Sequence, residues 1–306
     1  MDAIEKVFCA TDFSEASDEA IRQADQLARE HKAKLLVYHA MPSAIGSHPL
    51  LPQLDTQATA DLPALQAQIL DSLSERVMSL TGRGEDDVQV QVGEGEPYAA
   101  IVSRAEAAGA DLIVVGGQRA SGLKRLLIGD VAERVVRYAH CPVLVARPGP
   151  KAARILVATD FSDPALPAVA AAADQARLRS ARVTIVHSLD LPDIAASQPR
   201  PDLGALIGGG GPPEPVRTEL HKAAEERLAS AIARFNLPAD PVVTDGHPAT
   251  DIPRLAADLP ADLVVVATSG RTGIRRVMLG SVAEAIVRAS PCSVLVVRLK
   301  SGGHQS

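Results

Sequence analysis

Aromatic residues are scarce in this sequence of 306 residues, where they make up 2% of the chain and tryptophan is absent. Proteins that bind single-stranded nucleic acids stack bases on aromatic side chains, so this composition argues against such a role. Positive charge is also limited, because 31 lysine and arginine residues stand against 37 aspartate and glutamate residues, a formal net charge of −6. Nucleic-acid binders normally show a basic stripe, and we expect no nucleic acid among the partners.

Cysteines are few in the sequence, and long apolar segments are absent. The three cysteines, Cys9, Cys141 and Cys292, are widely spaced and form no CxxC motif, which argues against a disulfide framework or a zinc site. We expect Cys141 and Cys292 to be buried residues at strand entries rather than nucleophiles. No apolar run approaches the ~20 residues of a membrane span, and Met1–Lys6 lacks the apolar core of a signal peptide. The predicted location is the cytoplasm, with no membrane partner.

Familiar catalytic motifs are missing as well. The sequence contains no GxSxG elbow, no HExxH and no GxxxxGK(S/T) loop, the patterns of serine hydrolases, zinc proteases and P-loop NTPases. No nucleophile stands beside a positioned base. We therefore predict no dedicated enzyme, although slow ATP hydrolysis stays open.

An internal repeat is the strongest feature that is present. Four blocks occur twice, in the same order in both halves: Val7–Ser14 with Ile155–Ser162, Asp111–Val115 with Asp262–Val266, Ile128–Glu133 with Leu279–Glu284, and Cys141 with Cys292 before a Val-Leu-Val strand. Chance similarity does not preserve order over four blocks. We predict a tandem duplication with domain 1 at residues 1–147 and domain 2 at residues 152–300, joined by a short connector that keeps the halves in contact.

Each half alternates short apolar runs with helical patterns. Several runs are continuous stretches of Val, Leu and Ile, such as Leu112–Val115 and Leu263–Ala267, which indicates strands buried on both faces. The predicted fold class is α/β, with a doubly wound parallel sheet in each half and helices on both of its faces. In such a sheet, ligands bind at the carboxyl ends of the strands.

Aspartate and histidine residues are predicted at that edge of each sheet. Asp12 and Asp160 follow the first strands, and His39 and His187 close the second strands. Each aspartate could hold a ribose or a metal, or could cap the next helix. An aspartate–histidine pair could bind a metal or act as an acid–base couple, and the alternative is that the histidines pack at the strand ends.

The stretch after the fourth strand of the second half is the most informative one. Ala267–Gly270 is followed by nine residues and then by Gly280 and Ser281. Glycines let backbone N–H groups approach an anion, and the helix that starts near Gly280 offers unpaired N–H groups. These features predict a phosphate site. Ser281 would add a hydroxyl donor to that site or would serve as a plain N-cap.

This ordered set of features resembles the universal stress protein family. The likeness rests on a loop of the form G-x2-G-x9-G-(S/T), on the Ala-Thr-Asp-Phe-Ser opening of both halves, on Ser121–Gly129 and on the final Val-Leu-Val strand, and it covers nearly the whole chain twice. The resemblance implies two Rossmann-like sheets of five strands in the order 3-2-1-4-5, paired through their fifth strands. We therefore expect an intramolecular pseudo-dimer, and a homodimer is compatible with the sequence too.

The resemblance also implies a ligand, ATP or a related adenine nucleotide such as AMP, with or without Mg²⁺. Adenine would lie beside the first and second strands and the triphosphate on the glycine loop, mainly in domain 2. Carried over by position, the binding residues are Ala158, Asp160 and Val186 toward the adenosine, and Ala267, Gly270, Arg271, Gly280, Ser281 and Val282 toward the phosphates. Ala267 stands where the first glycine is usual, which we expect to weaken binding without abolishing it.

The first half departs further from the family pattern. Arg119 replaces the second glycine, and Asp130 replaces the terminal Ser/Thr. A carboxylate ~4 Å from a phosphate costs about 1 kcal/mol in water and about 4 kcal/mol at an effective dielectric constant of 20. Arg119 could partly offset this cost by pairing with Asp130. The sequence predicts an empty or much weaker first site.

Three functions remain in view from the sequence. The first is a stress-response or signalling module that binds ATP and changes its shape or partners. The second is a nucleotide-free structural or interaction protein that keeps only the fold, which the altered first loop and Ala267 favour. The third is a slow phosphohydrolase or a metal-dependent enzyme that uses the aspartate–histidine pairs.

Overall fold

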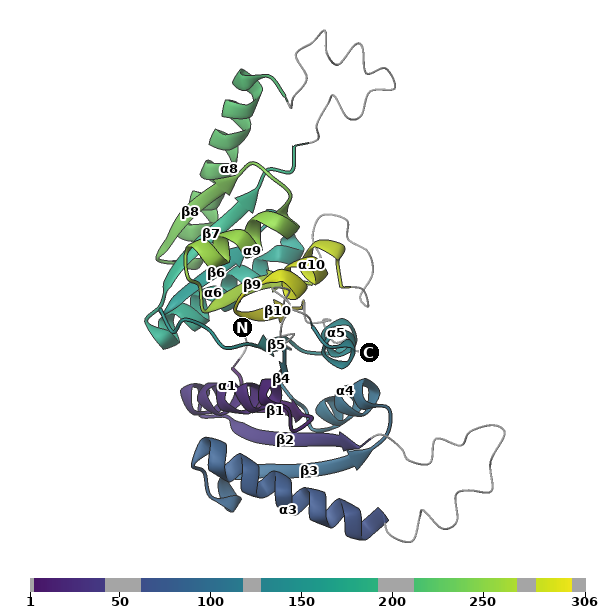
Figure 1. Cartoon of the computed structure of the whole chain (residues 1–306). Coiled ribbons are helices and arrows are strands. Elements are labelled where there is room, and N and C mark those ends of the chain that lie inside the picture. Colours follow the sequence, from purple (N-terminus) through teal and green to yellow (C-terminus); the bar gives the residue numbers. More distant parts are fainter. Residues whose placement is uncertain (1–2, 42–61, 118–127, 192–211, 269–278, 299–306) are drawn as a thin grey trace, which may run out of the picture. The chain divides into compact units, whose positions relative to one another are not determined.

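The computed structural model describes residues 3–41, 62–117, 128–191, 212–268 and 279–298, which form two compact α/β units (Figure 1). Among these residues, unit 1 comprises those up to Pro148 together with Leu279 and residues 293–298, and unit 2 comprises Gly149–Thr268 and Gly280–Cys292. The α/β class is the one predicted from the sequence. The predicted domain boundaries follow the repeat, whereas unit 1 also takes in the last strand of the second repeat.

Unit 1 is built on a sheet with the strand order β3-β2-β1-β4-β5-β10. The first five strands are parallel, in the 3-2-1-4-5 order that the resemblance implies. β10 pairs antiparallel with β5, which is the pairing expected between fifth strands. The strands are β1 (Lys6–Thr11), β2 (Lys34–Met41), β3 (Val88–Glu94), β4 (Leu112–Gly116), β5 (Val143–Ala146) and β10 (Ser293–Val297).

Helices cover both faces of this sheet. α1 (Glu15–His31) and α3 (Leu62–Thr81) contact each other on one face, and α4 (Pro97–Ala107) and α5 (Asp130–Tyr138) contact each other on the other (Figure 1). The short 3₁₀ helix η1 (Glu85–Asp87) leads into β3. Because β1 and β4 are covered on both sides, their apolar residues are buried without alternation, as the continuous apolar runs predict.

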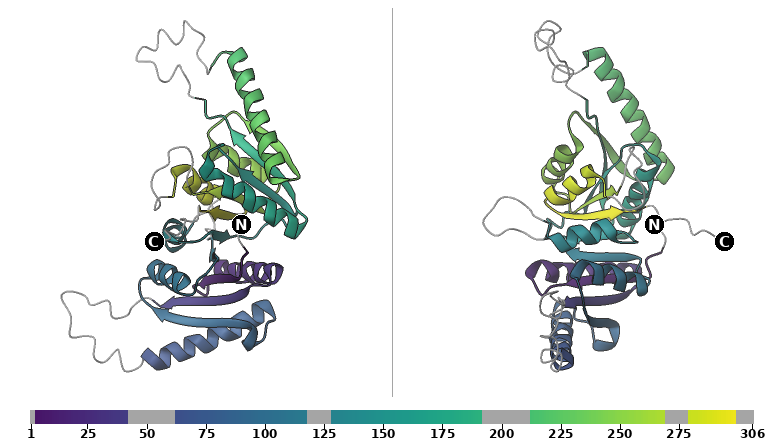
Figure 2. Two further views of the ribbon diagram at one scale, coloured as in Figure 1. Left: turned by 180° about the vertical axis from the view of Figure 1, so that it is seen from behind. Right: turned by 90° about the vertical axis from the view of Figure 1, so that its right-hand side faces the viewer.

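Unit 2 repeats this plan around parallel strands in the order β9-β6-β7-β8. These strands are β6 (Arg154–Ala158), β7 (Arg182–Ser188), β8 (Ala239–Thr244) and β9 (Leu263–Ala267). One face carries the 3₁₀ helix η2 (Asp163–Ala165), α6 (Leu166–Arg179) and α8 (Glu214–Phe235), and the other carries α9 (Pro248–Asp258) and α10 (Ser281–Ala289). Figure 2 shows α8 lying along β7 and β8.

Local sequence signals account for several helix ends. Pro97 and Pro248 open α4 and α9, because the fixed φ of proline suits the first helical position. α1 starts after the N-cap Ser14, whose hydroxyl accepts from the N–H of Ser17. In the described part of the chain, no helix is both long and apolar enough to cross a membrane.

Arg298, the residue after β10, caps the carboxyl end of α5 in unit 1. The guanidinium of Arg298 donates to the carbonyl oxygens of Val136 and Arg137 in the last turn of α5. Carbonyl groups in a final turn have no acceptor role left within their own helix, and a cation there also opposes the negative end of the helix dipole. Burial lowers the pKa of Arg298 from its usual value. The second repeat thus supplies a capping residue to unit 1.

Candidate functional site

A cavity of about 410 Å³ lies at the carboxyl edge of the sheet in unit 2. The ends of β6, β7 and β9 form its floor, and the first turns of α9 and α10 form its walls. Many of its side chains are apolar, including Val186, Ile252 and Ile286. Ligands of doubly wound sheets bind at this edge, and the volume lies within the usual range of small-molecule pockets.

Most of the binding residues predicted from the sequence line this one cavity. Gly270 and Arg271 lie outside the described residues. The other seven of the nine are all in its lining: Ala158, Asp160, Val186, Ala267, Gly280, Ser281 and Val282. The lining also includes Asp190, Pro248 and Ile252, which were not among the binding residues predicted from the sequence.

The start of α10 presents backbone donors to the cavity. Its N-cap is Gly280, in an extended conformation (φ −63°, ψ 146°), and no side chain in the described part of the chain caps the helix. The first three helical residues, Ser281, Val282 and Ala283, line the cavity, and their N–H groups have no acceptor within the helix. Because Gly280 is the N-cap, the alternative that Ser281 serves as a plain N-cap is wrong. An anion bound here would meet several N–H donors and the positive end of the helix dipole.

Gly280 holds the start of α10 close to the end of β9. Its N–H donates to the carbonyl oxygen of Thr268 at 2.8 Å. A Cβ atom at Gly280 would lie 3.2 Å from that oxygen, which is a tight contact. The absence of a side chain therefore lets the two segments approach, which fixes the donor groups of α10 beside the strand ends.

The turn after β6 fixes the carboxylate of Asp160. Phe161 has a φ of 64°, in the left-handed region, and its N–H donates to the hydroxyl of Thr159 at 3.1 Å. The N–H and hydroxyl of Ser162 then donate to Oδ1 of Asp160, at 3.0 and 2.6 Å. Unit 1 repeats the turn with Thr11, Asp12, Phe13 and Ser14. The local chain therefore positions an acidic group at the strand end in both units.

The two strand-end histidines are held by backbone carbonyl groups. Nδ1 of His39 lies 2.8 Å from the carbonyl oxygen of Thr11, and Nδ1 of His187 lies 2.8 Å from that of Thr159. Because a carbonyl oxygen only accepts, Nδ1 carries the proton in both rings. The buried His187 ring also packs against Phe161, with centroids 4.2 Å apart. This geometry supports packing at the strand ends, and the described residues contain no group of three or more His, Cys, Asp or Glu able to hold a metal.

In unit 1, a bulky side chain occupies one position that corresponds to the cavity lining. Tyr38 lies opposite Ala10 in the β1–β2 register, as Val186 lies opposite Ala158 in the β6–β7 register. Tyr38 is buried, and its ring packs against Phe8 with centroids 5.7 Å apart. A tyrosine ring thus takes up volume where unit 2 has only a valine.

A charged cluster marks the start of α5 in unit 1. Asp130 is the first residue of α5, and Arg134 lies one turn later with its Nε 3.9 Å from the Asp130 carboxylate. Arg134 also donates to Glu96 at 2.8 Å and stacks over the ring of Tyr98 at 4.3 Å. Arg119, the predicted partner of Asp130, lies outside the described residues. The positions of unit 2 that match Arg134, Glu96 and Tyr98 in the repeat are occupied by Ala285, His247 and Ala249.

Hydrogen bonds favour the ionised form of Asp12, the strand-end aspartate of unit 1. Burial by itself would raise the pKa of Asp12, but hydrogen bonds from Ser14 and Ser17 outweigh burial and hold that pKa below its usual value. Unit 1 has an aspartate, Asp130, at the helix start where unit 2 has Ser281, in addition to the strand-end aspartate that both units share. This difference supports the prediction that a polyanion binds unit 1 more weakly.

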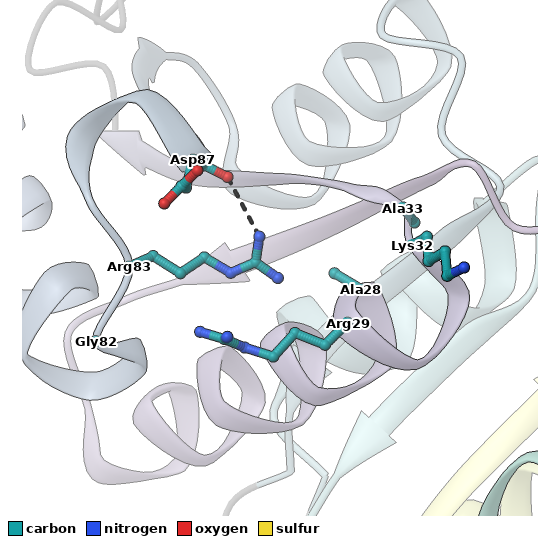
Figure 3. A pocket seen from close by; sticks show the side chains of 7 residues that line it. All are labelled: Ala28, Arg29, Lys32, Ala33, Gly82, Arg83 and Asp87. Atoms are coloured by element: carbon teal, nitrogen blue, oxygen red, sulfur yellow. Dashed lines mark hydrogen bonds between the residues drawn. The ribbon is translucent and has the colours of Figure 1, made fainter.

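A second cavity, of about 350 Å³, lies in unit 1 near the amino-terminal end of β2 (Figure 3). Arg29, Lys32 and Arg83 give it a basic lining. Both arginines are already engaged, because each donates to the buried carboxylate of Asp25, and Arg83 also donates to the carbonyl oxygen of Asp87 at 3.3 Å. These contacts join α1 to the segment before β3, so the cluster has a structural role.

The three cysteines are buried free thiols. Burial raises the pKa of Cys9, and burial and then the charge of Asp111 raise that of Cys141 to about 12. Since the thiolate is the reactive form, we expect the native protein to react with no thiol reagent within minutes at pH 8. The same assay in denaturant should titrate three thiols. A single rapidly reacting thiol in the native protein would contradict the assignment of buried, non-nucleophilic cysteines.

Known universal stress proteins align with this chain over part or nearly all of its length. Universal stress protein Rv2005c of Mycobacterium tuberculosis is 32% identical over 196 residues, which cover 62% of this chain and 62% of that protein. Universal stress protein Rv2623 of the same organism is 26% identical over 308 residues and covers 95% of this chain and 96% of its own length. A universal stress protein structure from Archaeoglobus fulgidus aligns with a TM-score of 0.64 at 18% identity, over 97% of this chain and 99% of that one, which supports the fold alone.

The match to a protein family is twofold. The model of the universal stress protein family matches residues 3–147 and again residues 152–298. The two matches follow the internal repeat and leave only the connector and the ends of the chain uncovered. This chain therefore belongs to the universal stress protein family and contains the family domain twice in tandem.

Proposed function

We propose that unit 2 binds ATP or a related adenine nucleotide, and that the protein is a stress-response or signalling module whose shape or partners depend on the bound nucleotide. One observation carries the proposal: the start of α10, which no side chain of the described residues caps, borders a cavity at the carboxyl edge of the sheet. The first N–H groups of a helix have no partner within the helix. An anionic ligand is the simplest partner for these donor groups.

The phosphates would lie at the start of α10. The N–H groups of Ser281, Val282 and Ala283 and the hydroxyl of Ser281 would donate to phosphate oxygens there. Gly270 and Arg271 would complete the loop on the basis of the family pattern. Mg²⁺ would be held mainly by phosphate oxygens, because this cation is usually bound through substrate phosphates rather than by a protein cage.

The nucleoside would lie toward β7 and α9. The apolar side chains of Val186, Pro248 and Ile252 suit a flat, weakly polar ring. Asp160 would accept a hydrogen bond from a ribose hydroxyl, since its carboxylate is fixed at the end of β6. The cytoplasm remains the location predicted from the sequence.

A second function has a specific observation in its favour. Ala267 lines the cavity where the family pattern has a glycine, so a methyl group stands at a place where backbone would approach the ligand. The charged cluster of unit 1 adds to this view. A nucleotide-free scaffold that acts only through its surface would account for both features.

Release of bound nucleotide and thermal unfolding distinguish these two functions. We expect denatured, freshly purified protein to release an adenine nucleotide close to one mole per mole of chain. ATP at 100 times its dissociation constant should stabilise unit 2 by about 2.7 kcal/mol, which corresponds to a rise in melting temperature of roughly 5–10 °C. Less than about a tenth of a mole released, together with no melting shift at millimolar ATP, would support the scaffold instead.

A further inference from the structure

Asp190 and the start of α10 line the same cavity in unit 2 and follow different strands. Asp190 follows β7 by two residues, whereas α10 follows β9, and β6 lies between these two strands. Neighbouring strands are about 4.8 Å apart, so the ends of β7 and β9 lie ~10 Å apart. This separation is on the scale of a nucleoside, so a base near β7 and a phosphate near α10 could belong to one ligand.

The backbone around Asp190 is held in a defined turn. The N–H of Asp190 donates to the carbonyl oxygen of Ser188 at 3.1 Å, and the N–H of Leu189 donates to that of Thr244 at 2.7 Å. The Asp190 side chain is 60% exposed and lines the cavity beside Pro248 and Ile252. A carboxylate thus stands at the edge of an apolar slot, on a turn that is anchored to β8.

The nearest charged or polar group to this carboxylate among the described residues is the ring of His247. Nδ1 of His247 accepts from the N–H of Ala249 at 3.2 Å, so the proton of the neutral ring is on Nε2. Nε2 lies 3.9 Å from Oδ2 of Asp190. This separation exceeds a hydrogen bond, and the described residues provide no closer polar partner for the carboxylate. Its oxygens therefore remain available to accept from a ligand.

We infer that Asp190 reads the base of the bound nucleotide by accepting a hydrogen bond from the 6-amino group of adenine. The inference rests on the proposed function and adds a specificity residue to it. A carboxylate is an acceptor only, so it favours a base edge that carries an N–H donor. It also disfavours the reversed orientation, because a phosphate next to Asp190 would be repelled.

Isothermal titration of the full-length protein with two ligands tests this role. The ligands are ATP and purine riboside 5′-triphosphate, which is the same molecule with hydrogen in place of the 6-amino group. A hydrogen bond to a charged group predicts that the wild-type protein binds ATP roughly 10- to 100-fold more tightly than the analogue. Asp190→Ala should bind both ligands equally, with the wild-type affinity for the analogue, which also shows that the cavity is intact.

Two further variants serve as controls for Asp190→Ala. Asp190→Asn retains an acceptor oxygen and should give an intermediate preference for ATP. Asp240→Asn changes an exposed carboxylate on β8 that does not line the cavity, and it should keep the wild-type ratio. Because the ratio compares two ligands on one protein, a general loss of stability would not alter it.

The outcomes separate this inference from the proposed function. An unchanged ratio in Asp190→Ala, or an equal affinity of the wild-type protein for both ligands, would overturn the role of Asp190 while nucleotide binding stands. Failure of the wild-type protein to bind either ligand would overturn both.

Discussion

Replacing Ser281 with aspartate should reduce the ATP-induced rise in melting temperature and leave the unliganded protein folded. The substitution gives unit 2 the residue that unit 1 has at the start of α5. A carboxylate ~4 Å from a phosphate costs about 1–4 kcal/mol, depending on the local dielectric, and this weakens binding roughly 5- to 1,000-fold. The helix itself should not suffer, because an acidic group in the first turn interacts favourably with the dipole.

The repeat supplies the matched control for this variant. Asp130→Ser makes the reciprocal change in unit 1, and we expect it to leave the ATP-induced shift as it is in the wild-type protein. Removing one carboxylate does not clear the position of Tyr38 or move Arg134 from the start of α5. Thermal unfolding and titration with ATP would compare the two variants directly. A full shift in Ser281→Asp, or its loss in Asp130→Ser, would contradict the assignment of the site to unit 2.

The structural elements whose sequence patterns occur in both halves could be predicted from the sequence. The continuous apolar runs predict buried parallel strands, and the Thr-Asp-Phe-Ser turn recurs in both units with the same left-handed phenylalanine. Seven residues from separate segments of the sequence line one cavity because parallel strands end at a common edge. The hydrophobic pattern predicts where each strand ends, and the parallel topology brings those ends to one edge of the sheet. Local sequence patterns were therefore enough to predict that these residues line the cavity.

Features that depend on a single repeat could not be predicted. Asp190 lines the cavity on a turn anchored by Thr244, and Arg134 is a partner of Asp130 among the described residues. The matching positions of the other half are occupied by Pro42 and Ala285, so no repeated pattern points to these residues. Side-chain partners across a helix face depend on packing, which spacing in the sequence does not specify.

The contact of Arg298 with α5 is also absent from the sequence pattern, and it leads to the largest expected effect on stability. Arg298→Met keeps a long apolar stem but removes the donors to Val136 and Arg137. Each carbonyl group left buried without a partner costs about 1–3 kcal/mol. We therefore expect unit 1 to lose about 2–4 kcal/mol of its free energy of unfolding, a fall in melting temperature of roughly 5–15 °C.

Arg288→Met is the matched control for Arg298→Met. Arg288 lies on α10 with 52% of its side chain exposed, and it pairs with Glu284 at 3.1 Å. Exposed ion pairs contribute about 0–1 kcal/mol, so this variant should melt close to the wild-type protein. Thermal unfolding of both variants without nucleotide would test the prediction. Equal melting temperatures would mean that water replaces the guanidinium at the end of α5, and that the capping contact contributes little.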